Sequence, residues 1–299
     1  MATVAVVQEL VAPPTQEPRT IGSILVHNRN FLIGAGVFLA LVVIALISSQ
    51  LFGPGPLRSG AFRPKLAPGA AGALMGTTTL GQSVLAQLMV AIPRSCLVGL
   101  LAASVGTSVG ALIGLSGGYF GGRVDAVLRV LVDVFLSVPS LLFLILIASL
   151  LRGVSVPLLA LIIGAFAWAW PARAVRSQVL SLKEQPFVQV AKLSGLSGIE
   201  IVWGELLPHL LPWLGANFVN AFIAGVLAES GLSILGLGPQ SDMTLGMMIY
   251  WALSYSAILQ NLWWWWMSPV LLLIILFMAL YLVHLGLDEV SNPRLRAET

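Results

Sequence analysis

The sequence has few charged residues. Only 9% of its 299 residues are Asp, Glu, Lys or Arg, whereas 58% are hydrophobic and the mean hydropathy is +0.96. A soluble domain normally carries about a quarter charged residues, so most of this surface must face something other than water. The scarcity of charge excludes an ordinary soluble domain and favours a membrane protein. The net charge of +3 then bears on orientation in the membrane and not on nucleic-acid binding.

The sequence has a single cysteine and lacks the Walker A phosphate-binding motif. Cys96 is the only cysteine, which excludes an internal disulfide and a cysteine-based metal site, and its apolar neighbours predict a packing role. The sequence has no Gly-Lys dipeptide, which a Walker A phosphate-binding loop requires. We therefore expect no catalytic residue, metal or cofactor in this chain. Any energy from ATP must come through a partner.

Long apolar runs are abundant. Each of the six runs is long enough to cross a bilayer, which takes about 20 residues, and each must be helical because lipid offers the backbone no hydrogen-bond partner. The sequence thus predicts an all-α, polytopic membrane protein with six transmembrane helices. The expected spans are Phe31–Phe52, Ser95–Ser116, Val130–Leu151, Val156–Val179, Trp213–Leu237 and Trp263–Leu287.

The expected organisation is a transmembrane domain at 31–290 between two tails, 1–30 and 291–299. The first tail is polar, so the run that begins at Phe31 is interpreted as a retained span and not as a cleaved signal peptide. If the N-terminus is cytoplasmic, ten of the 15 Lys and Arg residues fall on the cytoplasmic side, as the positive-inside rule requires. Both tails are then cytoplasmic, with a long external loop at about 53–94 and a long cytoplasmic loop at about 180–212.

The cytoplasmic loop is amphipathic. Pro186 marks a helix start, Gly195 and Gly198 mark a break, and a second short helix is expected to end at Pro208. Two short helices joined by a glycine turn form a platform for another protein. The alternative is an amphipathic helix that lies on lipid.

Two acids lie within or beside expected spans, where a carboxylate is costly and is a functional candidate. Glu229 precedes glycines at 231, 236 and 238 that are expected to unwind or kink the fifth span, and Ser230 and Ser233 lie near it in the sequence. These residues are candidates for a translocation path or its gate. The alternative is a carboxylate buried in a subunit interface. Asp133 is expected to pair with Arg129, one turn earlier.

Small residues recur at three- and four-residue steps along the second expected span. They are Ala103, Gly106, Gly110 and Gly114. Such a face permits close helix packing, so it predicts a helix–helix contact within the chain or with a second subunit.

The cytoplasmic loop resembles the Glu-Ala-Ala loop of binding-protein-dependent ABC importer permeases. That motif continues with three residues, a glycine, nine residues and Ile-x-Leu-Pro. Residues Gln189-Val190-Ala191 hold the Glu-Ala-Ala places, Gly195 holds the glycine and Leu207-Pro208 holds the Leu-Pro pair. Gln189 replaces the glutamate, and Glu205 stands at the isoleucine position.

Four further segments resemble the dipeptide/oligopeptide permeases of the C type. They keep the family order, and with the loop the resemblance covers about residues 25–293. The segments are Met75–Leu88, Gly117–Asp125, Asp133–Pro139 and Ala228–Gly238.

The resemblance implies the type I ABC importer permease fold and a non-enzymatic subunit that forms half of a translocation path in a bacterial inner membrane. Its implied partners are a B-type permease, two ABC ATPase subunits that bind ATP and Mg²⁺, and an external substrate-binding protein. The family implies di- or oligopeptide substrates, although related permeases carry nickel chelates, glutathione, haem or other small solutes. The residues implied in ATPase docking are Gln189, Val190, Ala191, Lys192, Gly195, Leu196, Ser197, Leu207 and Pro208.

Two other classes remain as alternatives. An ion-driven secondary transporter would show inverted repeats and several paired acids at the membrane midplane, and the sequence contains no such repeat. A membrane scaffold without transport activity would not need a fifth span broken by glycines.

Overall fold

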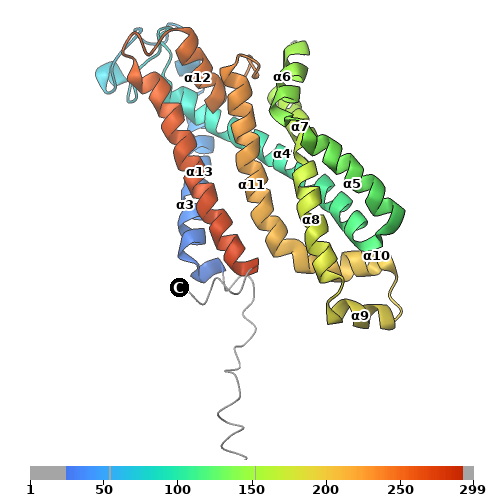
Figure 1. Ribbon diagram of the computed structural model, residues 1–299. Helices are drawn as coiled ribbons and strands as arrows, with labels where there is room; N and C mark the ends of the chain where they lie inside the picture. Colours follow the sequence, from blue (N-terminus) through green and yellow to red (C-terminus); the bar gives the residue numbers. More distant parts are fainter. Residues whose placement is uncertain (1–24, 54, 152, 292–299) are drawn as a thin grey trace, which may run out of the picture.

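A computed structural model describes residues 25–53, 55–151 and 153–291 (Figure 1). Of the expected tails, 1–30 and 291–299, residues 1–24 and 292–299 lie outside this part of the chain. Within it the chain forms helices and turns without an extended strand, as the all-α prediction requires. The helix α4 (Val84–Phe120) lies in the middle and contacts α3 (Arg29–Phe52), α7 (Val156–Ala167), α8 (Ala169–Leu182) and α11 (Leu207–Ile234).

Side-chain caps fix where two of the long helices begin. The Asn28 side chain accepts a hydrogen bond from the Phe31 backbone N–H at the start of α3, 2.9 Å away. Ser83 does the same for Ala86 at the start of α4. These caps satisfy N–H groups that the first helical turn leaves without partners. The helix α4 begins well before the expected Ser95, and its 37 residues span about 55 Å.

Two of the expected spans are bent. The helices α5 (Gly122–Ser137) and α6 (Ser140–Leu150) meet at 75°, and α7 and α8 meet at 41°. Pro139 lacks an N–H and forces Val138 into an extended conformation, which ends α5. Pro171 likewise leaves the carbonyl four residues earlier without its helical partner, next to the break at Trp168.

The six-span prediction is confirmed if each bent pair counts as one span. Four further stretches of the described chain are long and apolar enough to cross a membrane: α3, α4, the continuous helix from Gly198 to Ile234, and α13 (Trp263–Ser291). The sequence did not predict α12 (Leu245–Ser254), a short apolar helix between α11 and α13. It is too short to span a membrane by itself.

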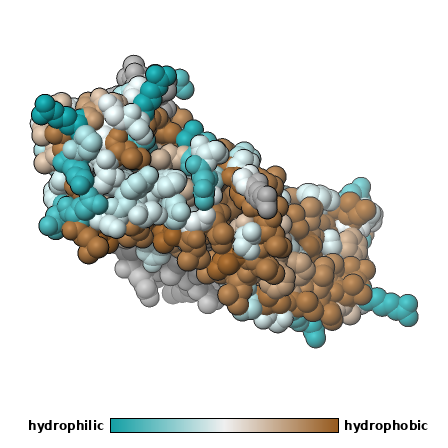
Figure 2. Space-filling view, turned by 90° about the horizontal axis from the view of Figure 1, so that it is seen from above, coloured by the Kyte–Doolittle hydropathy of each residue, from teal (hydrophilic) through white to brown (hydrophobic). Residues whose placement is uncertain are grey.

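The bundle of helices has two ends that differ in structure (Figure 1). One, the α9 end, carries α9 (Pro186–Leu193) and α10 (Gly198–Glu200). The other, the α12 end, carries α12 and the connection 55–83, which has two short 3-10 turns, Gly55–Leu57 and Ala70–Gly72. Seen from the α12 end, hydrophilic residues gather over one side of the face, and apolar residues cover the other side (Figure 2).

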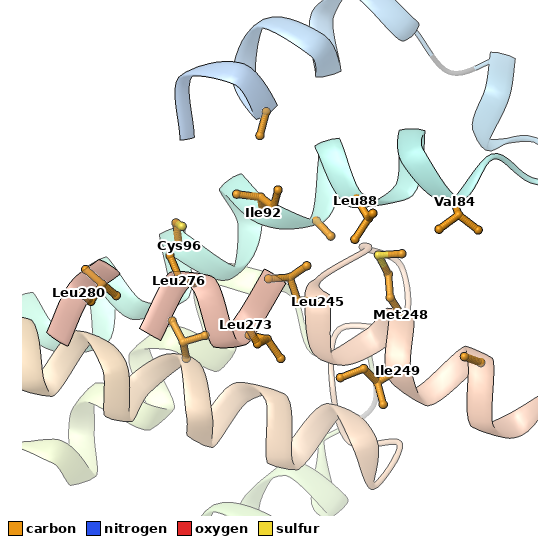
Figure 3. Packing of buried hydrophobic residues seen from close by; sticks show 14 of the residues in the cluster. Val84, Leu88, Ile92, Cys96, Leu245, Met248, Ile249, Leu273, Leu276 and Leu280 are labelled. Carbon is orange, nitrogen blue, oxygen red and sulfur yellow. The ribbon is translucent and has the colours of Figure 1, made fainter. Parts of the chain in front are cut away.

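The largest apolar core joins α4 to the α12 end (Figure 3). Val84, Leu88, Ile92 and Cys96 follow one face of α4 and pack toward residues of α12 and α13. Cys96 is 8% exposed within this cluster, which confirms its predicted packing role. The core therefore fixes α12 against the spans, although α12 itself crosses nothing.

The connection 55–83 is fastened to the same core. Thr77 donates a hydrogen bond to the Arg63 carbonyl and accepts one from the Leu66 N–H, each 2.8 Å long. The indole N–H of Trp264 donates to the Thr77 carbonyl at 3.1 Å. The expected external loop at 53–94 is shorter than predicted, because its last part forms the start of α4 at Val84.

Candidate functional site

The helix α9 packs one face on the spans and exposes the other. Val188 and Ala191 are buried in an apolar cluster with Leu206 and residues of α4 and α8. The Phe187 ring stacks on His209 of α11, with ring centroids 4.3 Å apart. The expected amphipathic helix is thus present, and it is held firmly to the first turn of α11.

A glycine turn follows α9, as the sequence predicts. Gly195 has φ +81, a left-handed conformation that favours glycine. Ser197 and Glu200 then form a reciprocal capping box: the Ser197 N–H donates to the Glu200 carboxylate at 2.7 Å, and the Glu200 N–H donates to the Ser197 hydroxyl. These local bonds start α10 immediately after the turn.

The second helix of the loop does not end at Pro208. It continues from α10 through a π-helical segment, Ile201–Leu206, into α11, so Leu207-Pro208 forms the first turn of the fifth span. Pro208 has no N–H to donate to an earlier carbonyl, and the wider π turn lies directly before it. The loop is therefore connected rigidly to the span that follows it.

The predicted docking residues divide by exposure. Gln189, Val190, Lys192, Gly195, Leu196, Ser197 and Pro208 are exposed, and Leu207 is half-buried. The predicted docking role of the Ala191 side chain is corrected, because this side chain is 6% exposed and packs inward. We call the exposed side chains of residues 189–203 the α9 surface.

The sequence analysis missed three apolar members of the α9 surface. Leu193 is 87% exposed, Ile199 65% and Trp203 52%. For Leu193 a signal was present, since an eight-residue amphipathic helix that buries one face turns its other apolar side chains outward, whereas Ile199 and Trp203 lie beyond α9. The α9 surface is therefore more apolar than the motif alone suggested.

The candidate gate residues lie in the contact between α11 and α12. Glu229 and Ser233 are completely buried, and Ser230 is 5% exposed. The carboxylate of Glu229 accepts hydrogen bonds from Ser233 at 2.7 Å and Thr244 at 2.6 Å, and a longer one from Ser230. A buried carboxylate needs such partners, and here they belong to its own chain. A role as a gate stays a prediction, and it would require α12 to move.

The expected break in the fifth span is wrong at Gly231. The helix α11 continues through this residue to Ile234, and the chain turns only at Gly236, where φ is +81. Gly246 of α12 lies so close that an added Cβ would stand 2.7 Å from the Ser230 Cα. Gly236, Gly238 and Gly246 permit close packing between this turn, α11 and α12, whereas a Cβ added to Gly231 would meet nothing within 4 Å.

The predicted small-residue face lies against α7 and α8 of the same chain. A Cβ added to Gly106, Gly110 or Gly114 would approach Ala167, Pro171 or Val175 within 3 Å. Ala103 is buried in the core cluster with Phe222 and Val226 of α11. The contact is therefore an internal one in the described chain.

A cavity of about 630 Å³ lies where the two bent spans face α11. Its lining includes Pro139 from the first bend and Trp170 and Pro171 beside the second. Asn217 and Asn220 of α11 add polar groups. The sequence analysis missed these two amides, although polar side chains inside an apolar run are the signal that such positions give.

Two ion pairs join α5, which precedes the first bend, to α8, which follows the second bend. Arg176 donates to Asp125 at 2.6 Å, and Arg173 donates to Asp133 at 2.6 Å. The expected pairing of Asp133 with Arg129 is therefore wrong. The prediction considered only residues one turn apart on a single helix, whereas Arg173 of α8 lies close enough to pair with the Asp133 carboxylate.

Comparison with known proteins identifies the class to which this fold and loop belong. Residues 106–297 match the family of binding-protein-dependent transport system inner membrane components. Because this match covers more than half of the chain, the chain belongs to that family. It is thus a permease component of a binding-protein-dependent transport system, as the resemblance implied.

Individual relatives agree with the family match. The oligopeptide transport system permease protein OppC of Mycobacterium tuberculosis is 31% identical over 228 residues, which are 74% of this chain and 78% of that protein. A peptide transport system permease protein of Brucella suis is 30% identical over 278 residues, 92% of this chain and 91% of that protein. OppC of Haemophilus influenzae is 35% identical over 170 residues, 56% of this chain and 54% of that protein.

Proposed function

We propose that this chain forms half of the translocation path of an ATP-driven importer of di- or oligopeptides. Membership of the permease family and the likeness to relatives named for peptide transport support this proposal. The observation that carries it is the α9 surface, an apolar platform fixed to the first turn of a span. Such a platform converts a movement of a bound protein into a movement of the span.

The partner at the α9 surface is proposed to be an ABC ATPase. The absence of a Gly-Lys dipeptide means that a Walker A site must be supplied by another chain. A short helix with exposed apolar residues fits a groove on a partner, where those residues fix the register. Val190 and Leu193 are the proposed anchors, because both are exposed and neither belongs to the apolar core.

The orientation and the remaining partners complete the proposal. The α9 end and both tails face the cytoplasm of a bacterial cell, and the α12 end faces an external substrate-binding protein. A homologous B-type permease supplies the other half of the path. The cavity between the bent spans and α11 is the proposed wall of the path in this subunit, because broken spans in transporters line such spaces.

The decisive experiment is reconstitution. The chain is expressed with its genomic neighbours, purified through a tag on this subunit, and placed in proteoliposomes with the binding protein. We expect the ATPase to co-purify and labelled tri-alanine to enter only with ATP. Uptake driven by an ion gradient without ATP would support a secondary transporter, and a preparation that never retains an ATPase would refute the importer.

The docking assignment has a narrower test. The Gly195→Glu substitution puts a charged side chain at the turn and strains its backbone. We expect ATPase association to be lost while membrane insertion is unchanged. Normal assembly of this variant would remove the docking role from the turn.

The choice of substrate can be tested in the same vesicles. Unlabelled peptides should compete with labelled tri-alanine, whereas a nickel chelate or haem should not. Competition by haem or the chelate alone would assign the chain to one of those branches of the family.

A further inference from the structure

The Asp133–Arg173 ion pair is unusual in its exposure. The two side chains are 51% and 57% exposed, whereas those of Asp125 and Arg176 are 19% and 26% exposed. Val130 and Val134 on the same helix are 62% and 55% exposed, while Arg129 and Arg176 line the same small cavity, of about 200 Å³, as the pair. Charged groups directed at hydrocarbon are costly. An exposed ion pair on a spanning segment is therefore expected to face water.

The pair lies one helical turn from the bend cavity. Leu136 and Trp170 line that cavity. Asp133 precedes Leu136 by three residues on α5, and Arg173 follows Trp170 by three on α8, so each charge shares a helix face with a cavity residue.

The order of the two ion pairs shows the direction in which this turn leads. Asp125 pairs with Arg176 and Asp133 with Arg173, so the residue number rises along α5 while it falls along α8. The two helices therefore run in opposite directions. A step of one turn toward the N-terminus of α5, or of one turn toward the C-terminus of α8, leads toward the α9 end. The ion pair thus borders the α9 side of the cavity.

We propose that Asp133 and Arg173 form a charged subsite of the path that binds the ammonium and carboxylate ends of a zwitterionic peptide. This proposal rests on the proposed function. The Asp133 carboxylate accepts hydrogen bonds from an ammonium group, and the Arg173 guanidinium binds a carboxylate in bidentate fashion. Asn217 and Asn220 line the neighbouring cavity, one helical turn away, and add amide groups to the same path.

The pairing of the two residues suits a path, which must release what it binds. In the empty path each charge neutralises the other across 2.6 Å. When a zwitterion binds, its ammonium group replaces Arg173 as the partner of Asp133, and its carboxylate replaces Asp133 as the partner of Arg173. No charge is therefore left without a counter-ion. Binding is then an exchange of ion pairs, and the net gain is small enough to permit release.

Thiol labelling in the assembled transporter tests exposure and charge together. Because Cys96 is the only cysteine, the Cys96→Ser chain gives a background without thiols. Asp133→Cys, Arg173→Cys and, as a control of similar exposure, Val134→Cys are then treated with membrane-impermeant methanethiosulfonates. We expect the cationic reagent to react faster with the Arg173→Cys variant, which retains Asp133. The anionic reagent should react faster with the Asp133→Cys variant.

Saturating tri-alanine in the presence of the binding protein and ATP should slow both reactions at least threefold and leave the Val134→Cys variant unchanged. Labelling that ignores reagent charge, or that tri-alanine does not slow, would overturn the subsite. An absence of labelling, which is expected if the pair faces a partner subunit, would also overturn the subsite.

Uptake distinguishes the two levels of the proposal. The Asp133→Asn variant should take up tri-alanine about tenfold more slowly, since it loses one charged hydrogen bond, while Val134→Ala should be normal. If the Cys96→Ser parent imports tri-alanine but the labelling results are negative, the subsite is wrong and the proposed function stands. If the unsubstituted chain also imports no peptide, both are wrong.

Discussion

The α11–α12 contact and the α9 surface are built in opposite ways. At the α12 end, the polar groups around Glu229 find partners within the chain, and Gly246 leaves no room for an added atom. At the α9 end, Leu193 is 87% exposed and a Cβ added to Gly195 would meet nothing within 4 Å. The α11–α12 contact is complete in this chain, whereas the α9 surface presents apolar side chains that a partner would cover. The difference separates a structural contact from a docking surface.

The comparison predicts the largest effect at Gly246. A Gly246→Val substitution puts its Cβ 2.7 Å from the Ser230 Cα, so α12 must separate from α11. We expect a loss of about 3 kcal/mol in unfolding free energy, measured by thermal unfolding in detergent. The control is Gly231→Ala on α11, where nothing lies within 4 Å and stability should be unchanged or slightly higher. Equal stability of the two variants would show that the α12 contact is loose.

A smaller effect is expected at Thr244. Its hydroxyl donates to Glu229 at 2.6 Å and accepts from the Met247 N–H at 3.1 Å. Thr244→Val keeps the shape but removes both bonds, and we expect a cost of about 2 kcal/mol. Thr244→Ser, which keeps the hydroxyl, should melt close to the parent. If valine is tolerated as well as serine, the hydrogen bonds to Glu229 do not hold α12.

The α9 end should show a small stability effect with a larger functional one. Gly195→Ala forces a side chain into φ +81, at a cost of about 1 kcal/mol. The global melting temperature should hardly change, but the ATPase retained in a pull-down should fall several-fold because the turn sets the angle between α9 and α10. Gly195→Asn should retain more ATPase, since asparagine tolerates this conformation. The reverse order would mean that the backbone of the turn is unimportant for docking.

Sequence reasoning was most reliable where a single segment decides the outcome. The length of an apolar run determines whether a helix can span the membrane, and a glycine with positive φ marks the turn after α9 whatever its surroundings. It was least reliable where two segments meet. The partner of Asp133 comes from α8, the partners of Glu229 include Thr244 of an unpredicted helix, and Ala191 faces inward because α9 packs on the spans. Such contacts depend on tertiary packing, which no local pattern encodes.

The most direct measurement of the central claim is site-directed cross-linking from each end. Leu193 at the α9 end and Leu259 in the α12–α13 connection are 87% and 85% exposed, so they form a matched pair. Each is changed to cysteine in the Cys96→Ser background, and the purified complex is treated with a short thiol-to-amine cross-linker. The account predicts an ATPase adduct from the Leu193→Cys variant and none from the Leu259→Cys variant. An ATPase adduct from the Leu259→Cys variant, or none from the Leu193→Cys variant, would contradict it.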